Sequence, residues 1–367
     1  MPSTPSRPIT IAVDAMGGDF APKEIIRGAL DGSRCYGVKV LLVGPTETIE
    51  HELASANTRG AVYEIVDAPD VIGMGESPAT AIRRKKNASI VVAARLVKDG
   101  KADAMTAAGS TGAAMAAALL YIGRIPGIDR PAIGVVLPSS SAPTLLLDAG
   151  ANADCIPEML LQFSQMGSVF MQNVYGVSHP RVGILNIGEE LGKGNSMVNA
   201  AFELLKHEPH LNFIGNVEGN DLFKGTCDVA VCDGFVGNVA LKSAEGLGKM
   251  LLHTLKKEFT SNLKSQAGAL LAKGALRRSK AKVDPSEHGG ALLLGINGIC
   301  VIGHGSSDAY AVENAIRVAR QAVDSNVLHK MTLFAGHQGE FTPHTPPHLL
   351  PVGVVESTPI VGESIVQ

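Results

Sequence analysis

Four glycine-containing junctions in this sequence combine residue types that can hold an anion. Glycines let backbone amides approach a phosphate, Ser, Thr and Asn side chains donate hydrogen bonds or cap a helix, and a lysine adds a positive charge. Each junction alone is also typical of a helix start with no ligand, but the four together favour a bound anion. They are Gly109-Ser110-Thr111-Gly112, Gly192-Lys193-Gly194-Asn195, Asp233-Gly234-Phe235-Val236-Gly237-Asn238 and His304-Gly305-Ser306-Ser307.

The elements that position these junctions follow from the pattern around them. Apolar runs ending in glycine-rich turns, each followed by a helical pattern, recur along the chain, which predicts an α/β fold with a largely parallel sheet covered by helices. Ligands of such sheets bind beyond the carboxyl ends of strands. The first predicted strand, 9–14, ends in this way at Asp14, Gly17, Gly18 and Asp19. Residues 132–152 differ, because Pro138 and a serine cluster split two apolar runs and predict an antiparallel hairpin.

Composition limits the class of protein. The chain has 367 residues, of which 45% are hydrophobic and 18% charged, so residues 1–330 can form one large α/β domain. With no Trp and only 4% aromatic residues, base stacking and a nucleic-acid partner are not expected. The five cysteines are scattered without a CxxC pair, which predicts neither a disulfide framework nor a zinc site and favours a reducing cytoplasm. No signal sequence or membrane span is predicted.

Two regions depart from the α/β pattern. Residues 249–282 contain nine Lys or Arg against Glu258 alone, a net charge of +8, whereas the whole chain totals −3. Leucines interrupt this basic stretch at helical spacing, which predicts a basic amphipathic helical pair that turns around Gly268 and projects from the domain. Residues 331–367 are rich in proline and are predicted to be a disordered or loosely attached tail.

The same residues also have ordinary structural explanations. Lys193 could be a solvated lysine, Asn238 the N-cap of the helix that follows it, and His304 a buried or capping histidine. The consecutive residues Arg83 to Lys86 form either a solvated helix surface or a docking surface for an acidic partner. The turn GEELGKGN lacks the P-loop spacing, and no GxGxxG follows the first strand, so neither ordinary nucleotide site is favoured.

Together, the motifs of residues 9–320 resemble the bacterial phosphate acyltransferase family, PlsX, of phospholipid synthesis. The resemblance implies a fold similar to isocitrate and isopropylmalate dehydrogenases and to phosphotransacetylase. It also implies the transfer of a long-chain acyl group from acyl carrier protein to inorganic phosphate, without a cofactor. The motifs are VDAMGGDFAP, SPATAIRRKKNAS, AGSTGA, LLDAGAN, NIGEELGKGN, GNVEGND, CDGFVGNVALKSAEG and GGALLLGINGICVIGHGSSDAYAVENAIR.

The resemblance also implies roles for individual residues. Lys193 and Asn238 are expected to be catalytic, through phosphate binding or stabilisation of the oxyanion. Substrate contacts or the walls of the cleft are expected at Asp14, Gly17, Gly18, Ser110, Thr111, Gly194, Asp233, Gly234, His304, Ser306 and Ser307. Docking of carrier protein or membrane is expected at Arg83, Arg84, Lys264, Leu270, Leu271, Lys273, Arg277 and Arg278. No metal site is expected.

The expected partners are acyl carrier protein, inorganic phosphate, an anionic membrane surface, a glycerol-3-phosphate acyltransferase that uses acyl phosphate, and a second copy of the chain. The expected location is the cytoplasm, with peripheral attachment to the inner face of the cell membrane.

Two other functions remain open. A metal- and NAD-dependent decarboxylating dehydrogenase would need clustered carboxylates, for which Asp14, Asp19, Asp148 and Asp233 are the candidates. A membrane-peripheral scaffold would use only the basic projection.

Overall fold

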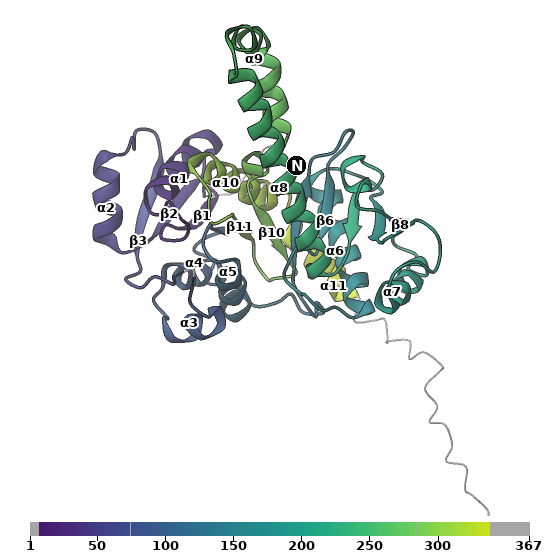
Figure 1. The fold of residues 1–367 in the computed structure, drawn as a ribbon. Helices are drawn as coiled ribbons and strands as arrows, with labels where there is room; N and C mark the ends of the chain where they lie inside the picture. The colour runs from purple at the N-terminus through teal and green to yellow at the C-terminus, as the bar shows by residue number, and fades with distance from the viewer. Residues whose placement is uncertain (1–6, 74, 284, 338–367) are drawn as a thin grey trace, which may run out of the picture.

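The computed structural model describes residues 7–73, 75–283 and 285–337, with the side chains of 277–283, 285, 288 and 337 outside the description. Within these residues one eleven-stranded sheet has the order β3-β2-β1-β4-β11-β10-β5-β6-β9-β7-β8 (Figure 1). The strands are β1 (Thr10–Asp14), β2 (Lys39–Gly44), β3 (Val62–Asp67), β4 (Ala104–Ala107), β5 (Ala132–Leu137), β6 (Thr144–Leu147), β7 (Arg181–Leu185), β8 (Asn212–Val217), β9 (Val229–Val231), β10 (Ala291–Leu294) and β11 (Cys300–Ile302).

Helices cover both faces of this sheet, which confirms the predicted α/β class. Helices α1, α6, α7, α10 and α11 supply the apolar core on one face, and α4, α5 and a π-helical segment supply it on the other. The helices are α1 (Lys23–Tyr36), α2 (Thr46–Ser55), α3 (Pro78–Arg84), α4 (Ser89–Lys98), α5 (Thr111–Ala117), the π-helix (Ala118–Ile122), α6 (Pro157–Val174), α7 (Ser196–Lys206), α8 (Gly234–Thr260), α9 (Leu263–Val283), α10 (Ala309–Asp324) and α11 (Val327–His337), with short 3-10 turns at Asp221–Phe223 and Pro285–His288.

The sheet consists of two parallel halves that run in opposite directions. Strands β3, β2, β1, β4 and β11 are parallel to one another, and so are β6, β9, β7 and β8. Three successive antiparallel pairings, β11 with β10, β10 with β5 and β5 with β6, join the halves. The hairpin predicted within 132–152 is therefore confirmed. The strands of the two halves therefore end on opposite sides of the sheet, and each such row of strand ends is called an edge below. The four junctions do not all lie at the same edge.

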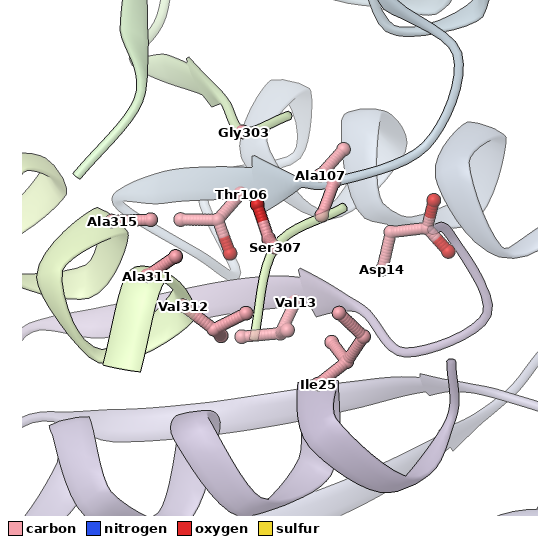
Figure 2. Close-up of a pocket in the computed structure, with 11 residues that line it drawn as sticks. Val13, Asp14, Ile25, Thr106, Ala107, Gly303, Ser307, Ala311, Val312 and Ala315 are labelled. Carbon is pink, nitrogen blue, oxygen red and sulfur yellow. The ribbon is translucent and has the colours of Figure 1, made fainter. Parts of the chain in front are cut away.

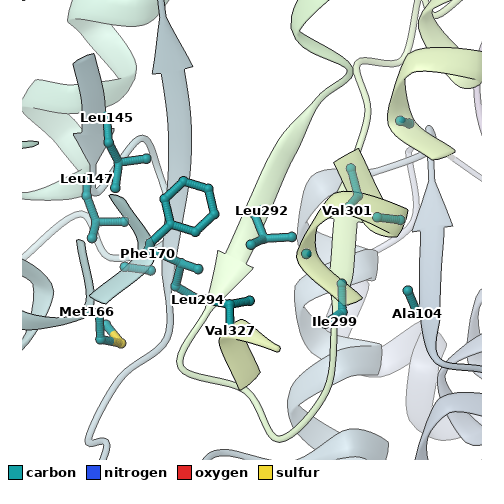
Figure 3. Close-up of a cluster of buried hydrophobic side chains, with 14 of the residues drawn as sticks. Ala104, Leu145, Leu147, Met166, Phe170, Leu292, Leu294, Ile299, Val301 and Val327 are labelled. Carbon is teal, nitrogen blue, oxygen red and sulfur yellow. The ribbon is translucent and has the colours of Figure 1, made fainter. Parts of the chain in front are cut away.

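One core nevertheless runs through both halves. Side chains of β6 and α6 meet those of β10 and α11, and these continue to β11 and β4 (Figure 3). In Figure 3, Leu147 and Phe170 lie toward Leu292 and Leu294, with Val301 beyond them. Because the core is continuous, the two groups of strand ends are held at fixed positions relative to each other.

Helices α8 and α9 form the predicted projection, which stands out from the body of the domain (Figure 1). The turn between them lies at Ser261 and Asn262, so the predicted turn at Gly268 is wrong and Gly268 lies inside α9. Leu263, Leu270 and Leu271 expose 82%, 72% and 91% of their surface, which leaves an apolar surface on the projection that no described part of the chain covers. No helix in the described ranges is both long enough and apolar enough to cross a bilayer.

The tail begins later than predicted. Helix α11 continues to His337, and its Met331 and Ala335 side chains are buried in the core. Residues 331–337 therefore belong to the folded domain, because their apolar positions pack against α6. The remainder of the predicted tail, 338–367, lies outside the described residues.

Candidate active site

The Lys193 turn follows β7 and is fixed by two asparagines. Asn186 Nδ2 donates to the Lys193 carbonyl oxygen at 3.0 Å and to Asn216 Oδ1 at 3.0 Å, and Asn216 Nδ2 donates to the Glu190 carbonyl oxygen at 3.1 Å. Gly194 has a φ of +91°, and a Cβ there would lie 2.4 Å from Asn186 Oδ1, so only glycine fits. The Lys193 side chain is exposed and has no ion pair with any side chain the structure describes. Its charge is available to a ligand.

Asn238 lies on α8, which begins at the carboxyl end of β9. Asp233 Oδ1 accepts a hydrogen bond from the Val236 amide at 2.8 Å, so Asp233 is the N-cap and the alternative role of Asn238 as a cap is wrong. The exposed Asn238 side chain lies one turn further along the helix. Strands β7 and β9 are neighbours in register, with Ile184 opposite Val231. Lys193, Gly194, Asp233, Gly234 and Asn238 therefore gather at one edge.

The second group of predicted residues surrounds the turn after β1. Gly18 has a φ of +113°, and a Cβ there would lie 3.1 Å from the Ala108 carbonyl oxygen and 3.2 Å from that of Gly305. A Cβ at Gly17 would lie 2.9 Å from the Gly109 amide nitrogen. The two glycines are required because this turn is packed between the turns that follow β4 and β11.

Asp14 is buried at the centre of this second group. Its Oδ1 accepts the Met16 amide hydrogen bond at 3.2 Å, and burial raises the pKa of the carboxyl group while a hydrogen bond from Ser89 opposes the rise. Asp14 therefore ties β1 to the start of α4, where Ser89 lies.

His304 and the serines complete the second group. Ser110 Oγ accepts from the Ala113 amide and caps α5, while Thr111 is exposed in its first turn. The Ser306 amide donates to His304 Nδ1 at 3.2 Å, which places the proton of the neutral ring on Nε2. Ser307 Oγ donates to the His304 carbonyl oxygen at 2.6 Å. His304 can therefore donate from Nε2 to a ligand.

Helix α8 connects the two groups. Asn238, Lys242, Glu245 and Lys249 are spaced four, three and four residues apart and share one side of the helix. Burial lowers the pKa of His304, and the nearby Lys242 ammonium group lowers it further. Lys242 Nζ lies 2.9 Å from Glu245 Oε2. A polar stripe therefore extends from Asn238 to the neighbourhood of His304, and sequence reasoning missed it because it depends on the path of α8.

A small cavity of about 10 Å³ lies beneath the second group (Figure 2). Thr106, Ser307 and Asp14 line it together with apolar side chains, and the buried Thr106 hydroxyl has no hydrogen-bond partner among the described residues.

We expect Thr106→Val to raise the free energy of unfolding by about 1 kcal/mol, because it removes an unpaired buried hydroxyl without changing the shape of the side chain. Urea denaturation measures this change. A decrease would show instead that the hydroxyl is paired, as with a buried water molecule.

None of the cysteines is suited to act as a nucleophile. Burial raises the pKa of Cys155 to about 11 and those of Cys227 and Cys300 to about 12. Burial also raises the pKa of Cys232 well above its ordinary value and that of Cys35 to a smaller extent. The reactive thiolate is therefore disfavoured at each position. A covalent acyl-cysteine step has no support from the site.

The carboxylates that a decarboxylating dehydrogenase would need are separated. Asp148 and Asp233 are engaged with backbone amides at the edge of β6 and β9, whereas Asp14 lies at the end of β1. Within the described part of the chain, no three His, Cys, Asp or Glu side chains are placed to hold a metal ion. The structure therefore does not form the acidic cluster on which this alternative depends.

The predicted docking residues lie in two places. Arg83 and Arg84 end α3, where Arg84 is 3.9 Å from Glu76, and the next residue, Lys85, pairs with Glu76 at 2.6 Å. Arg84 and Lys85 of this basic run are therefore engaged with Glu76 of the same domain. Lys264, Leu270, Leu271 and Lys273 are exposed on α9. Arg277 and Arg278 also belong to α9, but their side chains lie outside the described residues.

Comparisons with known sequences identify the family of this chain. A family model described as "Fatty acid synthesis protein" matches residues 9–330. The phosphate acyltransferase of Pelotomaculum thermopropionicum is 54% identical over 318 residues, which cover 87% of this chain and 92% of that protein.

Two solved structures share the fold. The structure of a phosphotransacetylase from Streptococcus pyogenes matches with a TM-score of 0.60 and 17% identity, over 87% of this chain and 95% of that one. A 4-hydroxythreonine-4-phosphate dehydrogenase from Klebsiella pneumoniae matches with a TM-score of 0.52 and 14% identity, over 86% and 100%. At this level of identity both matches concern the fold alone. The family match and the closely similar relative show that this chain belongs to the phosphate acyltransferase family, PlsX, and is an acyltransferase of fatty acid synthesis.

Proposed function

We propose that this enzyme transfers a long-chain acyl group from acyl carrier protein to inorganic phosphate and so forms acyl phosphate. The observation that carries the proposal is the placement of two residues beyond the carboxyl ends of the neighbouring strands β7 and β9. They are Lys193, a cation in a rigid turn, and Asn238, in the first part of α8. An ammonium group and a side-chain amide suit an oxyanion or a phosphate oxygen.

The proposed reaction needs positioned charges rather than a covalent intermediate. A phosphate oxygen attacks the thioester carbonyl carbon, the carbonyl oxygen becomes an oxyanion, and the carbon–sulfur bond then breaks to release the carrier thiol after protonation. Lys193 offsets the repulsion between phosphate and the developing oxyanion, and Asn238 donates a hydrogen bond to the same region. The raised pKa values of the cysteines support direct attack over an acyl-enzyme route.

The test is to incubate the purified enzyme with palmitoyl carrier protein and radiolabelled phosphate. We expect a labelled lipid that reacts with hydroxylamine, as an acyl phosphate does. A folded enzyme that binds carrier protein and yields no such product would contradict the proposal, and the scaffold function would then be preferred.

We further propose that acyl phosphate passes to a glycerol-3-phosphate acyltransferase for phosphatidic acid synthesis. We also propose that the fold relationship extends to isocitrate and isopropylmalate dehydrogenases.

We also propose that the active enzyme is a homodimer formed along α8. Val236, Val239, Leu247 and Met250 are 39%, 51%, 55% and 56% exposed and lie on one side of the helix. Ser243 and Gly246 lie on the same side, and such small residues permit close approach of a second helix. A second copy of this stripe is a matching apolar partner. Sedimentation of the purified protein as a monomer at micromolar concentration would contradict this arrangement.

The projection is proposed to bind the anionic inner surface of the cell membrane. Leu270 and Leu271 are exposed beside Lys264 and Lys273 on α9, which combines apolar area with positive charge. We expect Leu270→Asp with Leu271→Asp to weaken binding to anionic vesicles at least about 10-fold, because burial of two leucines is lost and two negative charges are added. Cosedimentation with vesicles measures the change.

A matched control is Leu120→Asp, since Leu120 is 51% exposed but lies outside the projection. Its vesicle binding should equal that of the unaltered protein. Unchanged binding of the double variant would remove α9 as the membrane contact and leave carrier protein as the partner of its basic side chains.

A further inference from the structure

Asp148, at the end of β6, is a buried carboxylate surrounded by hydrogen-bond donors. Its Oδ1 accepts from the amides of Ile133 and Gly150, each at 3.0 Å, and from that of Ala151 at 2.9 Å. Its Oδ2 accepts from the Asn152 amide at 2.7 Å and from Asn152 Nδ2 at 2.9 Å. The side chain is fully buried. It therefore fixes the whole 149–152 turn from within.

This turn is the surface against which α8 begins. The Gly234 amide donates to the Asn152 carbonyl oxygen at 2.7 Å, and a Cβ at Gly234 would lie 2.9 Å from Asp148 Oδ2. A Cβ at Gly237 would lie 1.8 Å from the Asp148 carbonyl oxygen. Two glycines of the first turn thus allow the helix to pack directly on the Asp148 backbone and carboxylate.

Asn238 lies close to the same turn. A Cβ placed on Gly150 would lie 3.5 Å from both Cβ and Oδ1 of Asn238. The φ of Gly150 is +136°, a backbone conformation that other residues rarely adopt. The base of the Asn238 side chain therefore lies near a turn whose shape depends on Asp148.

We propose that Asp148 is a positioning residue that holds the first turn of α8, and with it Asn238, in the geometry needed for phosphate. The role of Asn238 in this proposal rests on the proposed function. Asp148 does not touch the substrate in this account, since its oxygens are already occupied by the protein's own donors. It acts through the 149–152 turn.

The hydrogen-bond pattern explains why a carboxylate is required. Both oxygens accept only from N–H groups, so an asparagine would direct its NH2 group at a donor whichever way it is placed. Asp148→Asn therefore preserves size and shape while disturbing the turn. A displacement of about 1 Å in a reacting group can lower a rate about 100-fold.

The main test compares Asp148→Asn with a matched buried carboxylate. Asp228 is 5% exposed and accepts from the Arg181 amide at 2.7 Å, but it precedes β9 at the opposite end of that strand. We expect Asp148→Asn to lower kcat/KM for phosphate about 100-fold, measured where circular dichroism shows it to be folded. Asp228→Asn should lower the unfolding temperature and leave kcat/KM unchanged.

A double-mutant cycle separates positioning from a general loss of stability. If Asp148 acts through Asn238, Asp148→Asn should cost little further activity in an Asn238→Ala background. The proposal would be overturned if the fold-loss in kcat/KM of the double variant equalled the product of the fold-losses of the two single variants. It would also be overturned if folded Asp148→Asn had the kcat/KM of the unaltered enzyme. If Asp148→Asn does not fold, Asn152→Ala keeps the Asp148 carboxylate and removes the side-chain bonds from Asn152 to Asp148 and to the Pro131 carbonyl oxygen. We expect a loss in the same direction. No loss would again overturn it.

Amide hydrogen exchange provides a readout that is independent of catalysis. We expect residues 234–238 to exchange faster in Asp148→Asn than in the unaltered protein, with no such change in Asp228→Asn. Unchanged exchange would overturn the positioning role. If the unaltered enzyme makes no acyl phosphate, the proposed function fails, whereas faster exchange would still support the structural action of Asp148 on α8.

Discussion

Replacing Lys193 by methionine is expected to lower kcat/KM for acyl phosphate formation by about 100- to 1,000-fold, the usual effect of removing one group that stabilises an oxyanion. The turn should survive, because Asn186 and Asn216 hold it through the Lys193 carbonyl oxygen and neighbouring backbone rather than through the ammonium group. Methionine keeps most of the side chain's length and apolar stem. The loss can therefore be attributed to the charge.

Lys206→Met is the matched control, since Lys206 is an exposed lysine in the last turn of α7, the helix that begins after the Lys193 turn. Initial rates with palmitoyl carrier protein at several phosphate concentrations, together with melting temperatures, distinguish chemistry from folding. Near-normal activity of Lys193→Met would exclude this lysine from the reaction. The next candidates would be Lys242, a cation of the α8 stripe, and His304, a hydrogen-bond donor in the turn after β11.

Local chemistry made several features predictable from the sequence. Ser110 and Asn195 were identifiable at helix starts because short polar side chains can cap the amides three residues later, and each of them does so. The cap of α8 is instead Asp233, where the sequence had offered Asn238. The 132–152 hairpin was predictable because proline and serines interrupt two apolar runs. In each case the interaction is complete within a few residues of the chain.

The parts that the sequence did not predict depend on long-range geometry. The reversal between the two halves of the sheet is set by the pairing of β10 with β5, whose strands are more than 150 residues apart in the chain. Asn216 supports the Lys193 turn from the neighbouring strand β8. No periodicity or local motif reports such contacts. The polar stripe of α8 was missed for the same reason.

The projection shows the limit of composition as a guide. Charge and leucine spacing indicated two helices, but the turn between them was predicted at Gly268. The structure places the turn at Ser261 and Asn262, where Asn262 Oδ1 accepts from the Ser265 amide at 2.9 Å and starts α9. The start of α9 thus has a side-chain cap, whereas Gly268 lies within an exposed helix, where a glycine costs about 1 kcal/mol relative to alanine.

Gly237→Ala should combine a large loss of stability with a large loss of activity. Its Cβ would lie 1.8 Å from the Asp148 carbonyl oxygen, a backbone atom of the residue that follows β6 and whose amide donates to the Cys232 carbonyl oxygen, so the start of α8 must move. Overpacking of this kind costs about 1–3 kcal/mol. Because Asn238 is the next residue, we also expect kcat/KM for phosphate to fall about 100-fold at temperatures where the variant remains folded.

The same helix supplies the control for Gly237→Ala. Nothing lies within 4 Å of a Cβ placed on Gly248, so Gly248→Ala should gain up to about 1 kcal/mol of stability from helix propensity and keep its activity. Urea denaturation and phosphate kinetics on both variants give opposite signs for stability if the packing is as described. If Gly237→Ala were as stable and active as Gly248→Ala, α8 would not rest on the Asp148 turn, and the geometry that couples the sheet edge to Asn238 would have to be abandoned.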